Sequence, residues 1–214
     1  MAGEDRKPAR FVPWALVALC FVLGIASRSI GETFAVFVPS IQQAFEANRG
    51  SVTLIYGFSL LLGGTAAPVA GWIADRFGLR ALTMVGMMAA TLATAGASQA
   101  TKVWHLYLGL GVVMGFGSAS LSGVLSSTLL GRWFPANRLG VAIGVSWSAS
   151  GVGAMATIPI AQHLIATEGW RGAYIVFACA SAVFIPLLMF LPWRRIERGA
   201  PGLVPLRAAG DAGP

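Results

Sequence analysis

The sequence predicts an all-α integral membrane protein with six transmembrane helices, arranged as two inverted repeats of three helices each. Three observations support this fold class. Of the 214 residues, 56% are hydrophobic and only 11% are charged, whereas a soluble domain carries about 25% charged residues. The apolar residues gather in long blocks, and the second half of the chain repeats features of the first at a constant offset.

The apolar residues form six blocks, at 13–40, 51–74, 81–98, 103–130, 139–165 and 173–192. A helix needs about 20 predominantly apolar residues to cross the hydrocarbon layer, and each block has or nearly has that length. Only helices and closed barrels satisfy their backbone in lipid, and the alternation typical of barrel strands is missing. We therefore expect a tail at 1–12, a transmembrane domain at 13–192, and a flexible tail rich in Pro, Gly and Ala at 193–214.

The first block follows a charged segment, an order that also occurs in secretory signal peptides. Here the charges are of both signs, with Glu4 and Asp5 beside Arg6. The apolar pattern also resumes after Arg28 as FAVFVPSI, and five further blocks follow. These features favour an uncleaved first helix over a signal peptide.

Positive side chains are distributed unevenly between the two sides of this arrangement. One side has Arg6, Lys7, Arg10, Arg76, Arg80, Arg132, Arg138, Arg194, Arg195, Arg198 and Arg207, and the other has Arg49, Lys102 and Arg171. Because Lys and Arg collect in cytoplasmic loops, we expect both termini in the cytoplasm, in a cell or inner membrane. This orientation accounts for the net charge of +7, so the charge predicts no nucleic-acid partner.

Cysteine and histidine are scarce. The two cysteines, Cys20 and Cys179, lie within apolar blocks, and His105 and His163 lie far apart in the sequence. This spacing indicates neither a disulfide framework nor a metal site. The sequence also has no nucleophile–base pair and no phosphate-binding loop, so we expect no cofactor and no enzyme activity.

The internal repeat has an offset of 91 residues. At this offset 22–27 falls on 113–118, Pro68 on Pro159, Gly78 on Gly169 and Arg80 on Arg171. Three helices are an odd number, so the second copy begins on the opposite side of the membrane, as in the inverted repeats of many secondary transporters. We assign the repeats to about 13–98 and 103–192. A shared composition of apolar helices is the alternative explanation.

The stretch GWIADRFGLR at 71–80 interrupts the apolar pattern and links the second and third blocks. Gly78 suits a tight turn, and Gly71 lets a neighbouring helix approach closely. Asp75 can meet a helix N-terminus or a basic side chain, while Arg76 and Arg80 can reach lipid phosphates or carboxylates. Charge contacts on one face only would hold a transporter closed there. A loop that merely sets orientation is the simpler alternative.

This loop resembles the signature sequence between helices 2 and 3 of the major facilitator superfamily, G-x-x-x-D-R-x-G-x-R. Gly71, Asp75, Arg76, Gly78 and Arg80 match it, while Leu79 stands where the family often has a basic residue. The resemblance implies a secondary transporter and a cytoplasmic gate at this motif. It also implies half of the family's fold, since members usually have twelve helices.

A second stretch is similar to the monocarboxylate and oxalate–formate transporter branch of that superfamily. The similarity rests on Trp133, Phe134, Arg138, Ala142, Gly144, Gly169, Trp170 and Arg171. Drug–proton antiporters of the superfamily often have an Arg in helix 4, where Gly111 stands, and a Gly-Pro pair in helix 5, which this chain does not reproduce. The resemblance therefore implies transport of small organic anions rather than drugs.

Arg28 and Glu32 are the ionisable residues of the first apolar block. Such residues are costly within a membrane and are candidates for function, and a spacing of four places them on one helix face. We expect Arg28 to pair with Glu32 in an empty site. A substrate carboxylate then competes for Arg28, and Glu32 takes a proton. If the helix instead ends near residue 27, Arg28 extends to the interface. The resembling branch often has a basic residue near the position of Glu32, and its main carboxylate-binding Arg lies in the second half.

Uncharged polar and aromatic residues complete the candidate site. Ser118 and Ser122 in the fourth block are cavity-lining candidates, although membrane serines commonly serve close packing. Tyr107 and Trp147 are candidate pocket walls, and Arg132 and Arg138 mark the loop before the fifth helix.

From these features we expect a secondary transporter, or half of one, that moves small organic anions such as monocarboxylates by alternating access with proton coupling or exchange. Its expected partners are the anion, membrane lipid, and a second six-helix half or a second copy of the chain. A non-transporting membrane scaffold or sensor, or a truncated transporter fragment, is the alternative.

Overall fold

The computed structural model describes residues 11–121, 123–191 and 193, and at a few of these positions it describes the backbone alone. Every regular element in these ranges is helical. The elements in chain order are α1 (Phe11–Glu32), α2 (Phe34–Phe45), α3 (Arg49–Ser98), α4 (Val103–Leu106), η1 (Tyr107–Val113, a π-helix), α5 (Met114–Leu121), α6 (Gly123–Gly131) and α7 (Ala136–Met189).

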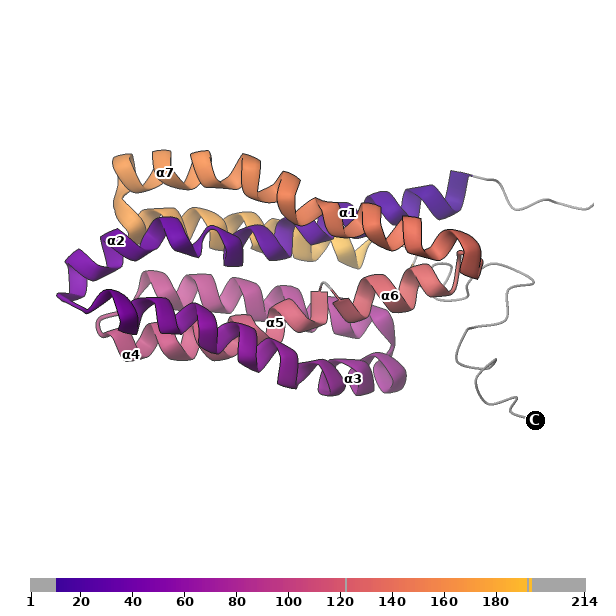
Figure 1. Ribbon diagram of the computed structural model, residues 1–214, viewed down its shortest axis with the longest axis horizontal. Coiled ribbons are helices and arrows are strands. Elements are labelled where there is room, and N and C mark those ends of the chain that lie inside the picture. The colour runs from indigo at the N-terminus through magenta and orange to yellow at the C-terminus, as the bar shows by residue number, and fades with distance from the viewer. Residues whose placement is uncertain (1–10, 122, 192, 194–214) are drawn as a thin grey trace, which may run out of the picture.

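Three helical stretches of the described chain are long and apolar enough to cross a membrane: Arg49–Ser98, Val103–Gly131 and Asn137–Met189. Phe34–Phe45 is a shorter apolar helix that continues in the direction of α1 (Figure 1). The prediction of an all-helical membrane protein is thus confirmed at the level of fold class. Where the sequence predicts separate blocks at 51–74 and 81–98, both lie in α3, and α7 contains the block at 139–165 together with residues 173–189 of the last block.

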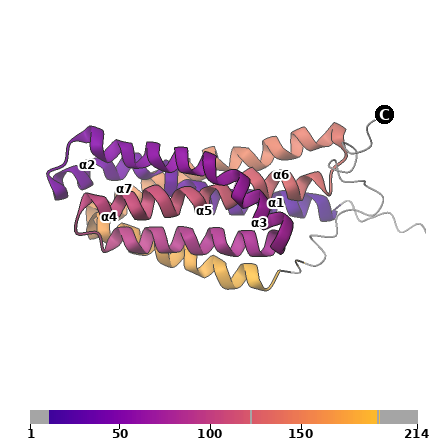
Figure 2. The same cartoon turned by 90° about the horizontal axis from the view of Figure 1, so that it is seen from below.

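α3 and α7 each fold back on themselves, as two perpendicular views show (Figures 1 and 2). Each contains one glycine with non-helical backbone angles: Gly78 in α3 (φ 85°, ψ 167°) and Gly169 in α7 (φ 74°, ψ 171°). These angles fall in a region that is essentially open to glycine alone. Pro68 and Pro159 lie inside the same helices, at equal distances before the two glycines.

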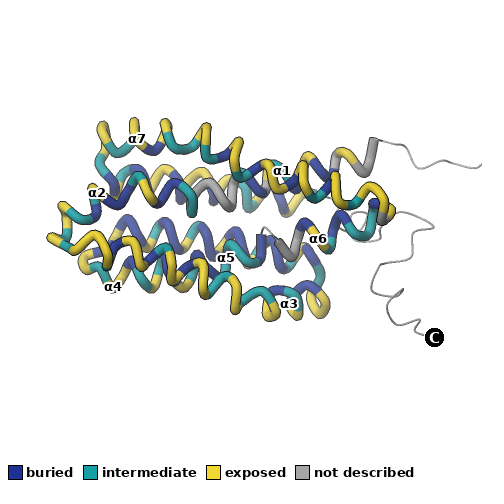
Figure 3. Tube along the Cα trace, in the orientation of Figure 1, coloured by how far each residue is buried: buried dark blue, intermediate teal, exposed yellow. Residues whose placement is uncertain are grey.

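The buried apolar residues form two main clusters along the bundle (Figure 3). One joins the beginning of α1 to the middle of α3 and the end of α7, and it includes Leu16, Cys20, Leu79, Leu82, Phe134 and Leu188. The other joins α2 to the beginning of α3 and the middle of α7, and it includes Phe34, Phe37, Ile41, Ile55, Trp170 and Tyr174. The second cluster supports the candidate site described below.

Small residues let α3 approach α5 closely. A Cβ atom on Gly115 would lie 2.8 Å from the Ser59 carbonyl oxygen, and a Cβ on Gly86 would lie 2.7 Å from Cγ of Leu121. Polar side chains add contacts between helices, as where the Thr91 hydroxyl donates to Oγ of Ser181 over 3.2 Å. Close backbone approach and hydrogen bonds between helices are the interactions that hold helices together in lipid.

Candidate functional site

A groove of about 310 Å³ lies at the junction of α1 and α2 beside the beginning of α3. It is lined by Gly31, Glu32, Phe34, Ala35, Val38, Arg49, Thr53 and Tyr56. The lining combines one carboxylate, one guanidinium, two hydroxyl groups and apolar side chains, which is the kind of surface that binds small polar molecules.

The local sequence explains how these residues come to share a surface. Arg49, Thr53 and Tyr56 have the spacing i, i+4, i+7, so they lie on one face of α3. Asn48 caps that helix: its Oδ1 accepts from the Gly50 amide over 3.3 Å, which fixes where α3 begins. On the opposite wall, Thr33 lies between the end of α1 and the beginning of α2 and keeps right-handed helical backbone angles (φ −72°, ψ −13°). The groove lies beside this junction.

Two opposite charges face the groove. Glu32 is the last residue of α1 and is half-buried, while Arg49 is the first residue of α3 and is exposed. Among the described side chains no ion pair joins Glu32 to Arg49.

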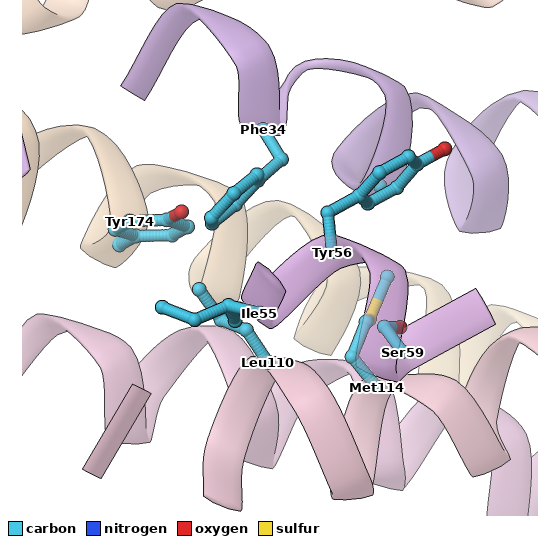
Figure 4. A pocket seen from close by; sticks show the side chains of 8 residues that line it. Phe34, Ile55, Tyr56, Ser59, Leu110, Met114 and Tyr174 are labelled. Atoms are coloured by element: carbon cyan, nitrogen blue, oxygen red, sulfur yellow. The ribbon is translucent and has the colours of Figure 1, made fainter. Parts of the chain in front are cut away.

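Behind the groove lies a second, much smaller cavity of about 20 Å³ (Figure 4). Its lining comprises Gly31, Phe34, Ile55, Tyr56, Ser59, Leu110, Met114 and Tyr174. Gly31, Phe34 and Tyr56 line both spaces. The rings of Phe34 and Tyr56 stack with centroids 6.1 Å apart and planes 13° apart, so this aromatic pair borders the groove on one side and the cavity on the other. A space of this size holds about one water molecule.

An aromatic core fixes the wall of this inner cavity. Tyr174 is 2% exposed, and its ring stacks on Phe37 with centroids 4.3 Å apart. Trp170 contacts Phe45 and Tyr174 at 5.7 and 6.3 Å between centroids. Because these rings are packed on several sides, the α2 wall of the groove is held rigidly against α7.

The structure assigns the predicted cavity residues to different places. Glu32 lines the groove, and Arg28 lies on α1 at a position whose side chain is outside the described part. Tyr107 begins η1, and its hydroxyl donates to the Ser51 carbonyl oxygen over 2.6 Å, which ties η1 to the start of α3. Ser118 donates to the Gly115 carbonyl oxygen over 2.9 Å within α5. Two other predicted residues are Trp147, which is 51% exposed on α7, and Ser122, which lies outside the described residues.

The predicted gate motif surrounds the turn of α3. Gly78 makes that turn, and Asp75, Arg76 and Arg80 are exposed beside it. The Arg76 guanidinium lies 5.4 Å from the ring centroid of Trp72 and 5.8 Å from that of Phe77. Leu79, where the resembling family often has a basic residue, is 1% exposed and belongs to the apolar core. Its burial explains why an apolar residue suits that position here.

The predicted loop arginines flank the connection between α6 and α7. Arg132 follows α6 and is half-buried, and Arg138 is exposed in the first turn of α7, where its amide donates to the Pro135 carbonyl oxygen over 2.9 Å. Across the described residues, no group of three or more His, Cys, Asp or Glu side chains gathers in a way that could hold a metal ion.

Sequence reasoning missed Arg49, Thr53 and Tyr56 as site residues. Arg49 enters that reasoning only as a charge that sets orientation. The signal that identifies them is the i, i+4, i+7 spacing of one charged and two hydroxyl-bearing residues in the first turns of an otherwise apolar helix. The facing wall of the groove is lined by Gly31, Ala35 and Val38, which have the same i, i+4, i+7 spacing.

Comparison with known proteins gives concordant matches over most of the chain. Human monocarboxylate transporter 11 is 29% identical over 204 residues, which cover 92% of this chain and 42% of the relative. Rat monocarboxylate transporter 12 is 29% identical over 174 residues, covering 81% of this chain and 35% of the relative. The chain therefore spans less than half the length of these curated relatives.

A solved structure and a family model complete the comparison. A crystal structure of a POT family transporter in complex with a thioalcohol-conjugated peptide superposes with a TM-score of 0.69 at 19% identity, covering 92% of this chain and 43% of that one. At that identity the likeness concerns the fold. The family model described as Major Facilitator Superfamily matches residues 15–209. The chain belongs to the major facilitator superfamily, whose members are transporters and not enzymes.

Proposed function

We propose that this chain is one half of a secondary transporter that moves small organic anions, such as monocarboxylates, across a cell or inner membrane by alternating access. Transport itself is the activity of its family, and proteins named monocarboxylate transporters are among its relatives. The observation on which the proposal rests is the groove, where Glu32 and Arg49 face a space that suits a small polar molecule.

The proposed topology is six crossings in two inverted repeats, with both termini in the cytoplasm. Two pairs of residues separated by the offset of 91 support it. Gly78 and Gly169 have nearly the same backbone angles, and Pro68 and Pro159 lie at matching places in α3 and α7. Unrelated apolar helices have no reason to share a turn of this rare conformation at one constant offset.

In the proposed mechanism, Arg28 and Arg49 attract the carboxylate of the substrate and Glu32 takes a proton. A cation is the natural partner of a carboxylate, and charge-assisted hydrogen bonds are about twice as strong as neutral ones. Glu32 ends α1 at its junction with α2 and lines the groove, which places its carboxylate where a substrate would bind. Drawing the substrate toward the arginines leaves Glu32 to accept the proton, which couples anion and proton movement.

Closure requires a second six-helix unit, and we propose that either a separate half or a second copy of the chain supplies it. The charged motif at 71–80 then forms the cytoplasmic gate, with contacts that break when that side opens. The mass of the purified protein in nanodiscs tests this arrangement, since a second copy predicts a dimer.

Uptake into proteoliposomes tests the function directly. A panel of labelled monocarboxylates and dicarboxylates is offered with and without an inward proton gradient, and then with an internal counter-anion. We expect saturable uptake of monocarboxylates that a proton gradient or a counter-anion stimulates.

Two variants locate the site. Arg28→Gln should weaken apparent affinity about tenfold or more, because a charge-assisted hydrogen bond contributes about 1.5–3 kcal/mol. Lys102→Gln, which removes an exposed charge outside the groove, is the control and should behave as the parent. Unchanged affinity in Arg28→Gln removes Arg28 from the site, and absence of uptake for every anion refutes the proposed function.

A further inference from the structure

The groove presents two unlike charges rather than one, and this bears on the kind of substrate that fits it. A site for a simple carboxylate needs a cation and apolar surroundings. Glu32 adds a carboxylate on the same surface, and a half-buried carboxylate next to an anionic ligand is unfavourable unless something positive lies between them. The described residues provide no such ion pair between Glu32 and Arg49.

The positions of the two charges along the helices keep them apart. Arg49 begins α3, and Tyr56, which lies seven residues later, stacks on Phe34 near the end of α1. Seven residues of helix span about 10 Å. Arg49 and Glu32 therefore start from different levels along the helices, and Phe34, Ala35, Val38 and Thr53 share the groove lining with them.

We propose, resting on the transport function inferred above, that the preferred ligand is a zwitterion, a small carboxylate that also carries a cationic nitrogen. Its carboxylate lies at Arg49, its nitrogen donates to Glu32, and its apolar part contacts Phe34 and Val38. The charges of Glu32 and Arg49 are then both paired by the ligand, whereas a plain carboxylate pairs only with Arg49. When the ligand has no cationic nitrogen, Glu32 instead binds the proton that the proposed transport mechanism requires.

The test compares three ligands of one carbon skeleton: butanoate, 4-aminobutanoate and butylamine. Binding to the purified full chain in nanodiscs is measured by calorimetry. We expect 4-aminobutanoate to bind about tenfold more tightly than butanoate or butylamine, as one added charge-assisted hydrogen bond predicts. A series from 3-aminopropanoate to 6-aminohexanoate should show one optimal length, because the two charges of the groove are held at a fixed separation.

Variants assign the two contacts. Glu32→Gln should abolish the advantage of 4-aminobutanoate and should leave butanoate binding equal or tighter, and Glu32→Asp should largely restore the advantage. Arg49→Gln should weaken both carboxylates. Glu32→Lys should shift the preference to butanedioate, since two cations then face the groove. Glu46→Gln and Lys102→Gln, which remove exposed charges outside the groove lining, are the matched controls, and size-exclusion profiles confirm that each variant is folded.

The two proposals fail in different ways. Equal affinity for butanoate and 4-aminobutanoate, with no effect of Glu32→Gln on their ratio, overturns the zwitterion inference and leaves transport of anions standing. Absence of binding for all carboxylates and amino carboxylates in the panel overturns the proposed function as well.

Discussion

Two links of this chain, separated by the offset of 91, share a backbone turn but differ in their surroundings. We call residues 71–80 the Gly78 link and residues 162–171 the Gly169 link. In both, the glycine adopts a conformation that is rare for other residues. In both, the next residue is buried: Leu79 is 1% exposed and Trp170 is 7% exposed. The turn thus places the side chain that follows it into an apolar cluster.

The charged residues of the two links differ in what they contact. Arg171 donates from Nη2 to the Ala100 carbonyl oxygen over 3.0 Å, and its guanidinium lies 4.3 Å from the Trp170 ring centroid. Arg76 instead lies over Trp72 and Phe77, which are 55% and 60% exposed. The Gly169 link is therefore tied to the connection between α3 and α4 by a hydrogen bond from Arg171. In the Gly78 link, Arg76 and the rings of Trp72 and Phe77 form an exposed cation–π group.

The largest expected effect is the difference in stability lost when a buried tryptophan and an exposed tryptophan are each replaced by alanine. Trp170→Ala should lower the free energy of unfolding by about 3–5 kcal/mol, because it empties a packed aromatic cluster. Trp72→Ala, which removes an exposed tryptophan of the Gly78 link, should cost less than about 1 kcal/mol. Reversible unfolding in detergent micelles measures both. Similar losses for the two variants would show that the packing difference between the links is not real.

The next effect tests what the two links share. Gly169→Ala and Gly78→Ala should each cost about 1–3 kcal/mol from backbone strain alone. An added Cβ at Gly169 meets no atom within 4 Å, so crowding cannot explain a loss there. Gly71→Ala is the control, because Gly71 lies within a helix and an added Cβ there meets no atom within 4 Å. It should be neutral or stabilising by up to about 1 kcal/mol. A cost at Gly71 equal to that at Gly78 would argue against strain as the cause.

The smallest effect compares the two arginines. Arg171→Gln removes a hydrogen bond and a cation–π contact and should cost about 1–2 kcal/mol. Arg76→Gln removes a cation–π contact between exposed groups and should cost about 0.5 kcal/mol. The same unfolding assay applies. If Arg76→Gln proves the more damaging, the Gly78 link makes structural contacts within this chain rather than facing outward.

Much of the helical architecture could be predicted from the sequence, because apolar blocks of membrane length admit few structures in lipid. Gly78 was predicted to make the turn within 71–80, and its counterpart Gly169 follows from the repeat offset. The junction of α1 and α2 at Thr33 could not be predicted, since Gly31–Phe34 reads as a continuation of an apolar helix. The π-helix at Tyr107–Val113 was also missed. It lies where Gly109 and Gly111 approach the backbone of α3, and such packing between distant segments leaves no periodic signal.

The residues of the candidate site could also be predicted only in part from the sequence. Glu32 is conspicuous as a carboxylate in an apolar block, so composition alone makes it a candidate, and it lines the groove. Arg49 lies just before an apolar block, where a cation is already expected from the charge bias that orients membrane proteins. Its place in the groove depends on how α3 packs against α2, which the sequence pattern does not indicate. Tyr107 and Ser118 were expected as cavity residues, but their hydroxyl groups make contacts within the bundle. Both are polar residues in an apolar block, and both donate hydrogen bonds to backbone carbonyl oxygens.

Six crossings in two inverted repeats require the Gly78 link and the Gly169 link to face opposite sides of the membrane. Single cysteines on a background that lacks Cys20 and Cys179 test this in right-side-out and inside-out vesicles with an impermeant maleimide. Phe77→Cys and Pro135→Cys should react only from the cytoplasmic side, and Glu168→Cys only from the opposite side; all three positions are exposed. Labelling of positions 77 and 168 from the same side would contradict six crossings in two inverted repeats.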